Sequence, residues 1–457
     1  MFAIPGLVAL LVFLFLRPQE IFPSLSGVTF PAVAAVVALG IVLDWRLAHS
    51  RPRMSAVFFV VTLFFGWEVV SAAVSAGDTL TTALAVSGAA WLFFAFISQS
   101  VQSFRALETL VVVVLVCSLV IVAVGIKQGL SPKVCLIRNG SGETGAGSVV
   151  SDGRSCVFAR DCEQDSPDPE AEYLCERTGP LGTSTISGRV RYRGVVEDPN
   201  ELAWVLSLSV PLVFTLFERR RTLRRFLLAA GTTVAVIVCV VMTQSRSGLL
   251  SLLTTLGVYF IRRFRWKGAA VGAILALPLL ILGGRSGEDA ESSSTERLEC
   301  WQAGLSMWKG SPFLGVGFRN FGEHHYLTAH NSFVLTLAEL GPLGLLLWTL
   351  VIYGSIKMLA RALRDFSGRP ETQPAAQWAM ALLAGMLGTL VSSFFLSIAY
   401  HGILWAFVGL VVAFWAAVRR HQPDWKFSFG FGDVVLIGFF DVGLMTSIEI
   451  YLRVRGI

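Results

Sequence analysis

The chain has 457 residues, of which 54% are hydrophobic and only 15% are charged, and its mean hydropathy is +0.66. A soluble globular domain has about 25% charged residues, so this composition excludes a soluble enzyme or a soluble binding module. It predicts an all-α polytopic membrane protein. The net charge of +6 does not require a nucleic-acid partner, because basic residues cluster between membrane spans on the cytoplasmic side.

Apolar windows recur along the chain. The ~30 Å hydrocarbon core of a bilayer requires about 20 apolar residues per helix, and about twelve windows approach that length. They are residues 2–16, 27–44, 55–76, 80–98, 107–126, 199–217, 226–243, 247–261, 268–283, 331–356, 376–399 and 402–418. The first window has no basic segment before it and no cleavage site before Arg17, so we expect a retained helix and not a signal peptide.

The positions of Lys and Arg predict the orientation of these spans. The basic clusters lie at 44–53, 218–225, 262–267, 357–369 and 419–426. If the windows cross the membrane in turn, all of these clusters fall on one side. The positive-inside rule makes that side the cytoplasm, with both termini there. The two long connections then lie on the opposite, periplasmic side.

The sequence therefore predicts six parts. They are helices one to five (1–126), a periplasmic cysteine-containing loop (127–198), helices six to nine (199–283), a second periplasmic loop with an amphipathic helix and the candidate catalytic residue (284–330), helices ten to twelve (331–426) and a C-terminal tail (427–457). Asp433, Asp441 and Glu449 lead us to expect that the tail does not span the membrane. Asp198 and Pro199 are expected to cap and begin the sixth span.

Four of the seven cysteines lie in the first long loop, namely Cys135, Cys156, Cys162 and Cys175. An even set of cysteines outside the cytoplasm predicts two disulfides, and four cysteines allow three pairings that the sequence does not separate. The alternative is a zinc site. The spacing lacks the close Cys pairs of structural zinc sites, so we favour disulfides and expect no metal.

Arginines lie beside the predicted spans on the outer side, where the positive-inside rule depletes basic residues. Arg189, Arg191 and Arg193 alternate in SGRVRYRG, which places them on one side of an extended segment. Arg246 lies in the short hairpin TQSRSGLL. Guanidinium forks match phosphate oxygens, so these residues predict a site for an anionic lipid head. The alternative is that the three alternating arginines pair with acidic residues of the first loop.

The second long loop contains the candidate catalytic residue. Apolar residues recur at helical spacing over 298–308, which predicts an amphipathic helix at the membrane surface with Arg297 near its start. The glycine-rich stretch GSPFLGVGFRNFG follows, and His330 comes next, in TAHNSF. A neutral imidazole can accept a proton from a sugar hydroxyl while arginines hold a departing diphosphate. The alternative is that His330 is a packed side chain at a helix start.

Four stretches then stand out in order. They are RYRGVVEDPNELA (191–203), TQSRSGLLSL (243–252), RLECWQAGLSMWKGSPFLGVGFRNF (297–321) and AHNSFVLTLAELGPLGLLLW (329–348). Together they resemble the O-antigen ligase and Wzy-type polymerase family of bacterial inner-membrane glycosyltransferases. The resemblance covers residues 190–350, and the opening FLRPQEIFPSL resembles members found with exopolysaccharide gene clusters.

The resemblance implies a GT-C-like fold and transfer of a glycan from undecaprenyl diphosphate to an acceptor hydroxyl at the periplasmic face. No nucleotide sugar, cofactor or obligatory metal is implied. His330 would activate the acceptor, Arg191 or Arg193 together with Arg246 would bind the donor diphosphate, and Arg297 is a weaker candidate for the same pocket. The implied partners are the bilayer and other polysaccharide-assembly proteins.

Two alternatives remain open from the sequence. A polymerase of this family joins repeat units of an exopolysaccharide or O-antigen, which the RPQE opening favours, whereas a ligase transfers glycan to lipid A core or to protein. A flippase or transporter of lipid-linked sugars is the alternative of another class. It predicts ionisable residues within spans, of which Glu68 is the main candidate, and symmetry between halves, which the sequence does not show.

Overall fold

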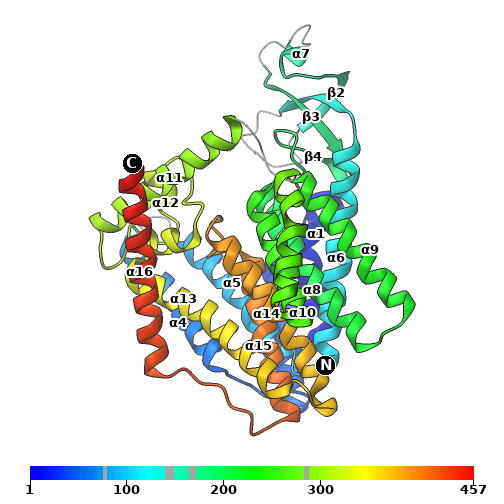
Figure 1. Ribbon diagram of the computed structural model, residues 1–457, viewed down its shortest axis with the longest axis vertical. Helices are drawn as coiled ribbons and strands as arrows, with labels where there is room; N and C mark the ends of the chain where they lie inside the picture. The colour runs from blue at the N-terminus through cyan, green and yellow to red at the C-terminus, as the bar shows by residue number, and fades with distance from the viewer. Residues whose placement is uncertain (76–79, 139–148, 164–170, 283–287, 457) are drawn as a thin grey trace. The chain divides into compact units, whose positions relative to one another are not determined.

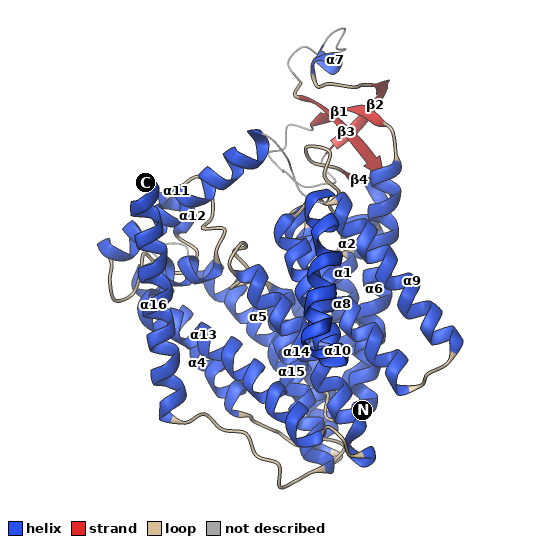
Figure 2. Cartoon of the chain, in the orientation of Figure 1, coloured by secondary structure: helices blue, strands red, loops and turns tan. Residues whose placement is uncertain are grey.

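The computed structural model describes residues 1–75, 80–138, 149–163, 171–282 and 288–456. Most of these residues are helical, and the strands lie between α6 and α8 along the chain (Figure 2). The chain forms two compact units. Their helices and strands are labelled in Figure 1. The first comprises Met1–Leu7, Ala34–Leu110 and Ser286–Ile457, and the second comprises Val8–Val33 and Val111–Arg285.

The first unit is built from helices. It contains most of α3 (Phe30–Arg46), α4 (Ala56–Ser75), α5 (Leu80–Ser100), α11 (Glu288–Gly310), α12 (Phe321–His324), α13 (Ser332–Phe366), the 3₁₀ helix η4 (Pro370–Thr372), α14 (Gln373–Ser393), α15 (Gly402–His421) and α16 (Phe431–Arg455). Helix α13 packs against α4, α11, α14 and α16, and α5 packs against α15. Trp405 of α15 lies in the core, with its ring centroid 5.3 Å from Phe64 and 4.6 Å from Phe65.

The second unit combines helices with a small sheet. It contains most of α1 (Ala3–Leu16), α2 (Pro18–Ile21), η1 (Pro23–Leu25), most of α6 (Phe104–Leu130), β1 (Lys133–Arg138), β2 (Val149–Ser155), α7 (Arg160–Glu163), β3 (Tyr173–Gly179), η2 (Pro180–Gly182), β4 (Thr183–Ser184), η3 (Gly194–Val196), α8 (Pro199–Arg219), α9 (Leu223–Met242) and α10 (Arg246–Leu282). Helix α8 packs against α9 and α10. It begins as expected, because the Asp198 carboxylate accepts hydrogen bonds from the N–H groups of Asn200 at 2.6 Å and Glu201 at 3.3 Å.

Every predicted apolar window overlaps a helix of the structure. Among the described residues, eight helices are long and apolar enough to cross a membrane, and Ala3–Leu16 and Leu84–Ser100 are shorter apolar helices. The polytopic membrane architecture is therefore confirmed, whereas the count of about twelve spans is not. The windows 247–261 and 268–283 both fall on α10, which is interrupted between them at Arg265, where φ is 53° and ψ is −138°. Residue 283 and the start of the second long loop, 284–287, lie outside the described residues.

The tail was expected not to span the membrane, but it contains a helix with the length and composition of a span. Helix α16 is continuous over 25 residues and is one of the eight helices long and apolar enough to cross. Two of its three acidic residues have cationic partners, whereas Asp441 is buried and both of its carboxylate oxygens lack a hydrogen-bond partner among the described residues. Asp433 accepts hydrogen bonds from Tyr353 Oη at 2.7 Å and Lys357 Nζ at 2.5 Å, and Glu449 accepts one from Lys309 Nζ at 3.0 Å. Paired carboxylates lower the cost of placing such a helix in lipid, which the sequence count of acidic residues did not reveal.

The all-α expectation is corrected in the first long loop. Four antiparallel strands form a sheet in the order β2-β1-β3-β4. Disulfides join Cys135 to Cys162 and Cys156 to Cys175, which is one of the three pairings left open above. The sulfur atoms of Cys135, Cys156 and Cys162 lie close enough together to suggest a metal site. All three are in disulfides, however, and a metal ligand must be a thiolate.

Maleimide labelling checks these disulfides. Denatured protein is expected to take up three labels per chain without reductant and seven after reduction, because Cys117, Cys239 and Cys300 are free and the other four of the seven cysteines are paired. Mass spectrometry counts the labels. In the folded protein, burial raises the pKa of Cys300 to about 11, so its thiol should react slowly at neutral pH. Seven labels without reductant would contradict the disulfides.

Candidate active site

His330 lies directly before α13, in the first unit. Asn331 caps the helix, because its Oδ1 accepts hydrogen bonds from the N–H groups of Phe333 at 2.9 Å and Val334 at 3.2 Å. The His330 side chain is half-buried, and its backbone has a φ of +48°, in the left-handed region that non-glycine residues rarely adopt. Strained backbone of this kind concentrates at functional sites. The structure thus places His330 next to the helix cap, in a conformation that needs support from its surroundings.

That support comes from the connection between α14 and α15. Ser332 Oγ accepts a hydrogen bond from the N–H of Ile398 at 3.0 Å. On the other side of the histidine, Thr328 Oγ1 donates to Ser397 Oγ at 2.8 Å. Residues on both sides of His330 are therefore bound to the same connection, which fixes the backbone from which the imidazole projects.

Helix α13 is broken within its first third. Gly341 has a φ of +67° and a ψ of −172°, and Pro342 follows it. Proline has no N–H group and its ring clashes with the carbonyl four residues earlier, so the helical hydrogen bonds stop here. The uninterrupted span expected over 331–356 is thus two helical pieces, and the carbonyl groups freed at the break need donors from elsewhere.

The glycine-rich stretch supplies most of these donors. They are the N–H of Val316 to Ala338 O at 2.8 Å, the N–H of Gly317 to Glu339 O at 3.0 Å and Trp67 Nε1 to Leu340 O at 2.8 Å. Gly315, with a φ of +68°, allows this approach, because a Cβ there would lie 2.5 Å from Ala338 O. The glycines of GSPFLGVGFRNFG therefore let one segment pack against the backbone of the helix that follows His330.

Substituting Gly341 by alanine tests this packing. A Cβ at Gly341 would lie 2.2 Å from Phe313 O, at a positive φ that alanine does not adopt without strain. We expect the variant to lose about 1 kcal/mol or more of stability and to melt at a lower temperature in detergent. The matched control is Gly443→Ala on α16, where nothing lies within 4 Å of the added Cβ. Equal melting temperatures for the two variants would contradict the tight contact.

Glu339 is a site residue that the sequence analysis missed. Its side chain is buried, and its carboxylate accepts hydrogen bonds from the N–H groups of Arg319 at 3.0 Å and Phe321 at 2.9 Å. The buried Tyr400 hydroxyl is nearby, and burial, followed by the carboxylates of Glu339 and Glu68, raises the pKa of Tyr400 well above its usual value. The signal in the sequence was a single carboxylate inside an apolar span, directly before a Gly-Pro break.

Arg319 is the second missed residue. Its backbone has a φ of +62°, its N–H is held by Glu339, and its side chain is exposed. The preceding Phe318 packs against Tyr400, with ring centroids 4.7 Å apart. Tyr400 belongs to the connection between α14 and α15 that also anchors the residues on both sides of His330. Arg319 is thus an exposed cation held on the same scaffold as the histidine.

The arginines at 189 and 191 are both buried in the second unit. Arg189 Nη2 donates to Asn200 Oδ1 at 2.8 Å. Arg191 Nε donates to Ser184 O at 3.0 Å, and its Nη1 donates to Glu197 Oε1 at 3.2 Å. These guanidinium groups therefore hold the start of α8 and the end of the sheet together. The hydrogen bond from Arg191 to Glu197 agrees with the alternative interpretation, in which these arginines pair with acidic residues of the first loop.

Arg193 and Arg246 differ from those two arginines. Arg193 Nη2 donates to Leu181 O, while its Nε is buried without a hydrogen-bond partner among the described residues. Arg246 is exposed in the first turn of α10. Ser245 caps this turn by accepting a hydrogen bond from the Gly248 N–H at 3.1 Å. The N–H groups of a helix start, together with an exposed guanidinium, suit an anion.

Two of the predicted arginine segments lie side by side within the second unit. The Val190 N–H donates to Met242 O at 3.2 Å, and Arg189 Nε donates to Thr243 O at 2.9 Å. Residues 189–193 therefore adjoin the hairpin that contains Arg246. His330 and Arg297 belong to the first unit.

Arg297 lies on α11, whose helical structure agrees with the predicted amphipathic pattern. Cys300, Leu305 and Met307 are buried, and the helix packs against α13. Gly304 permits the close approach, because a Cβ there would lie 2.5 Å from Val334 Cγ1. The apolar face is therefore covered by protein at its centre, and Arg297 is half-buried near one end of that contact.

One known protein family matches part of this chain. Residues 231–349, from α9 to the middle of α13, match the O-antigen ligase family. The resemblance to the O-antigen ligase and Wzy-type group is confirmed. The matched stretch includes Arg246, Arg297, Arg319, His330 and Glu339, and it ends before α14.

One relative of known name extends the comparison. The exopolysaccharide production protein ExoQ of Rhizobium meliloti (strain 1021) is 25% identical to this chain over an alignment 223 residues long, and the match covers 39% of this chain and 50% of ExoQ. The chain thus spans about half the length of this relative.

Proposed function

We propose that this O-antigen ligase-like chain is a membrane glycosyltransferase that polymerises the repeat units of an exopolysaccharide or O-antigen. The donor is a glycan linked to undecaprenyl diphosphate, and the reaction takes place at the periplasmic face of the bacterial inner membrane. The observation that carries the proposal is the family match over 231–349, which contains the strained His330 at the start of α13. The exopolysaccharide production protein ExoQ favours a polymer product.

In the proposed reaction, the acceptor hydroxyl oxygen forms a bond to the anomeric carbon of the donor glycan. The bond from that carbon to the diphosphate oxygen breaks, and undecaprenyl diphosphate leaves with the electron pair. The neutral imidazole of His330 accepts the hydroxyl proton. The leaving group gains negative charge as the bond breaks, so cationic groups that contact it favour the transition state.

We assign the diphosphate first to Arg246 and Arg193. Arg246 is exposed at a helix start, and Arg193 has a buried Nε without a hydrogen-bond partner among the described residues. Arg191 ranks below them, because Glu197 and a backbone carbonyl already accept its hydrogen bonds. Arg297 stays the weaker candidate, and Arg319 joins it as an exposed cation from the His330 scaffold.

A transporter of lipid-linked sugars is the second candidate function. The observation in its favour is Glu68, which is buried on α4, accepts a hydrogen bond from Ser87 Oγ at 2.5 Å and has an Oε1 without a partner among the described residues. Purified protein incubated with lipid-linked repeat units separates the two functions. A transferase forms longer lipid-linked glycans from them, and a transporter leaves their length unchanged.

The choice between polymerase and ligase is tested in a strain that lacks this chain. Loss of a polymerase should leave single repeat units on the lipid carrier, and re-expression should restore long chains. If long chains accumulate on the carrier instead, the chain is a ligase that delivers finished glycan to lipid A core or protein. Normal amounts and lengths of polymer in the deletion strain would contradict both assignments.

A further inference from the structure

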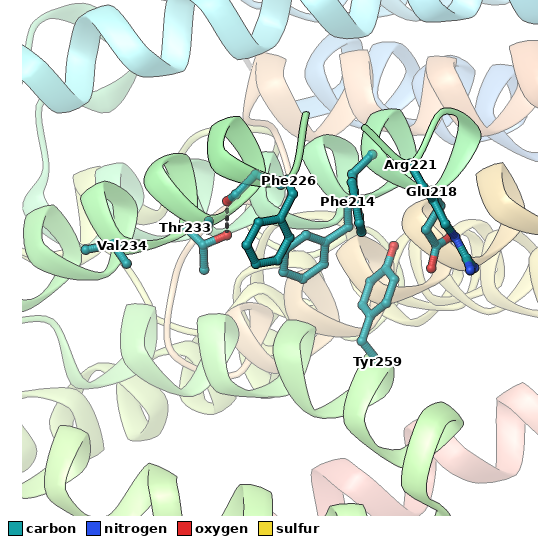
Figure 3. Close-up of a pocket in the computed structure, with 10 residues that line it drawn as sticks. Phe214, Glu218, Arg221, Phe226, Thr233, Val234 and Tyr259 are labelled. Atoms are coloured by element: carbon teal, nitrogen blue, oxygen red, sulfur yellow. Dashed lines mark hydrogen bonds between the residues drawn. The ribbon is translucent and has the colours of Figure 1, made fainter. Parts of the chain in front are cut away.

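The second unit contains a cavity of about 630 Å³ between α8 and α9, closed on one side by Tyr259 of α10 (Figure 3). It is lined by Phe214, Phe217, Glu218, Arg221, Phe226, Ala229, Ala230, Thr233, Val234 and Tyr259. Figure 3 shows the rings of Phe214, Phe226 and Tyr259 grouped in the middle, with Glu218 and Arg221 at one end and Val234 at the other. The cavity therefore has an apolar body and a charged end.

The polar atoms in the body of the cavity already have partners. Tyr259 Oη donates to Pro211 O at 3.2 Å, and Thr233 Oγ1 donates to Ala229 O at 2.7 Å. These side chains therefore present carbon surface to an occupant. Cavities of roughly 300–1,000 Å³ with such lining bind small organic molecules. Because the polar atoms of the cavity body are already hydrogen-bonded, a hydrocarbon chain suits it: such a chain has no polar group that needs a partner.

The charged end is strongly basic. Five arginines lie within residues 219–225, at the end of α8, in the turn after it and at the start of α9. Glu218 is the acidic residue at this end, and it interacts electrostatically with both Arg221 and Arg262. Cationic charge therefore remains in excess around Arg221. The positive-inside rule places this turn at the cytoplasmic surface.

We propose that this cavity binds an anionic diacyl phospholipid, with an acyl chain along Phe214, Phe226 and Tyr259 and the phosphate at Arg221. Helices α8 and α9 are both long and apolar enough to cross a membrane, and most of α9 is not buried within the protein, so acyl chains lie against α9. A cluster of four to eight basic residues at the cytoplasmic end of a span attracts anionic lipid heads, and guanidinium groups match phosphate oxygens.

The lipid carrier of the proposed reaction does not fit this position. The 21 residues of α8 extend over about 30 Å. Arg221 follows the C-terminal end of this helix, whereas residues 189–193 and Arg246 adjoin its N-terminal end. The phosphate site at Arg221 is therefore separate from the arginines assigned to the donor diphosphate, and the occupant is a phospholipid of the opposite leaflet.

Native mass spectrometry of the delipidated full-length protein tests the proposal, with phosphatidylglycerol, phosphatidylethanolamine and undecaprenyl phosphate as probes. Wild-type protein should prefer phosphatidylglycerol. Ala230→Trp fills the cavity and should lose this lipid, whereas Leu227→Trp, on an exposed face of α9 outside the cavity, should retain it. Arg221→Gln should weaken phosphatidylglycerol binding by about tenfold or more, and Arg224→Gln, outside the cavity lining, should weaken it much less.

Each variant is also assayed for a single elution peak and for its melting temperature, which would reveal a misfolded Ala230→Trp. In that case the lipid binding of Arg221→Gln, a substitution at an exposed residue, decides the test. Equal binding of phosphatidylglycerol and phosphatidylethanolamine to wild-type protein would overturn the proposal. Unchanged phosphatidylglycerol binding in Arg221→Gln, or its displacement from this cavity by undecaprenyl phosphate, would overturn it too. None of these measurements depends on glycan transfer.

Discussion

Replacement of His330 by alanine is expected to abolish glycan transfer while the protein still inserts and folds. Loss of a general base lowers rates by about 10²- to 10⁴-fold. The alanine side chain removes the proton acceptor but leaves the Asn331 cap and the contacts of Ser332 and Thr328 in place. The measurement is polymer length and yield in a deletion strain complemented with each variant, together with the amount of protein in the membrane fraction.

The matched control for this substitution is His324→Ala. His324 is an exposed histidine six residues earlier in the same unit, and its Nδ1 contacts Asn320 O at 3.0 Å. This variant should make normal polymer. If His330→Ala makes polymer of near-normal length and amount, His330 is not the general base. If both variants fail and both melt early, the segment has a structural role and the catalytic assignment is wrong.

Substitution of Arg246 by lysine should reduce glycan transfer strongly although the positive charge stays. A guanidinium group can donate two parallel hydrogen bonds to a diphosphate, whereas an ammonium group acts as a point charge. Loss of one charge-assisted hydrogen bond corresponds to a decrease of about 10- to 100-fold in affinity. The N-terminal position on α10 adds to this, because the N–H groups of the helix start contribute to the same anion site. The measurement is the initial rate against donor concentration.

Arg224→Lys is the control, because Arg224 is also exposed and lies at the other end of α9. Its rates should equal those of the wild-type protein. The assignment of Arg246 predicts a rise in KM for the lipid-linked donor. An unchanged KM and kcat in Arg246→Lys would leave the residue with a structural role only.

The helices were predictable because the membrane restricts which sequences can span it. A span must be apolar over about 20 residues, and each window that satisfies this became a helix. The cap at Asp198 was predictable for a similar reason, since its hydrogen bonds are to residues two and three positions later. The apolar length of α16 was discounted because of its three carboxylates, but two of them are paired by lysines of α13 and α11, which are 76 and 140 residues away along the chain.

The candidate site was predictable only in part. The position of His330 before a helix followed from the local pattern, but its left-handed backbone depends on bonds to residues near 397. The roles of Arg189 and Arg191 were not readable from their alternation, because their partners come from other elements. The sheet of the first loop was missed because its strands are short, and because the disulfides from Cys135 to Cys162 and from Cys156 to Cys175 hold this segment through residues that are distant in sequence.

The break in α13 has a consequence for how the protein is made. A nascent helix that exposes the carbonyl groups of residues 338–340 to lipid bears a cost of several kcal/mol for each unsatisfied group. Their donors, Trp67, Val316 and Gly317, all precede α13 in the chain and have therefore left the ribosome before it. The hydrogen-bond donors are therefore synthesised before the carbonyl groups that need them. They are available when α13 inserts into the membrane.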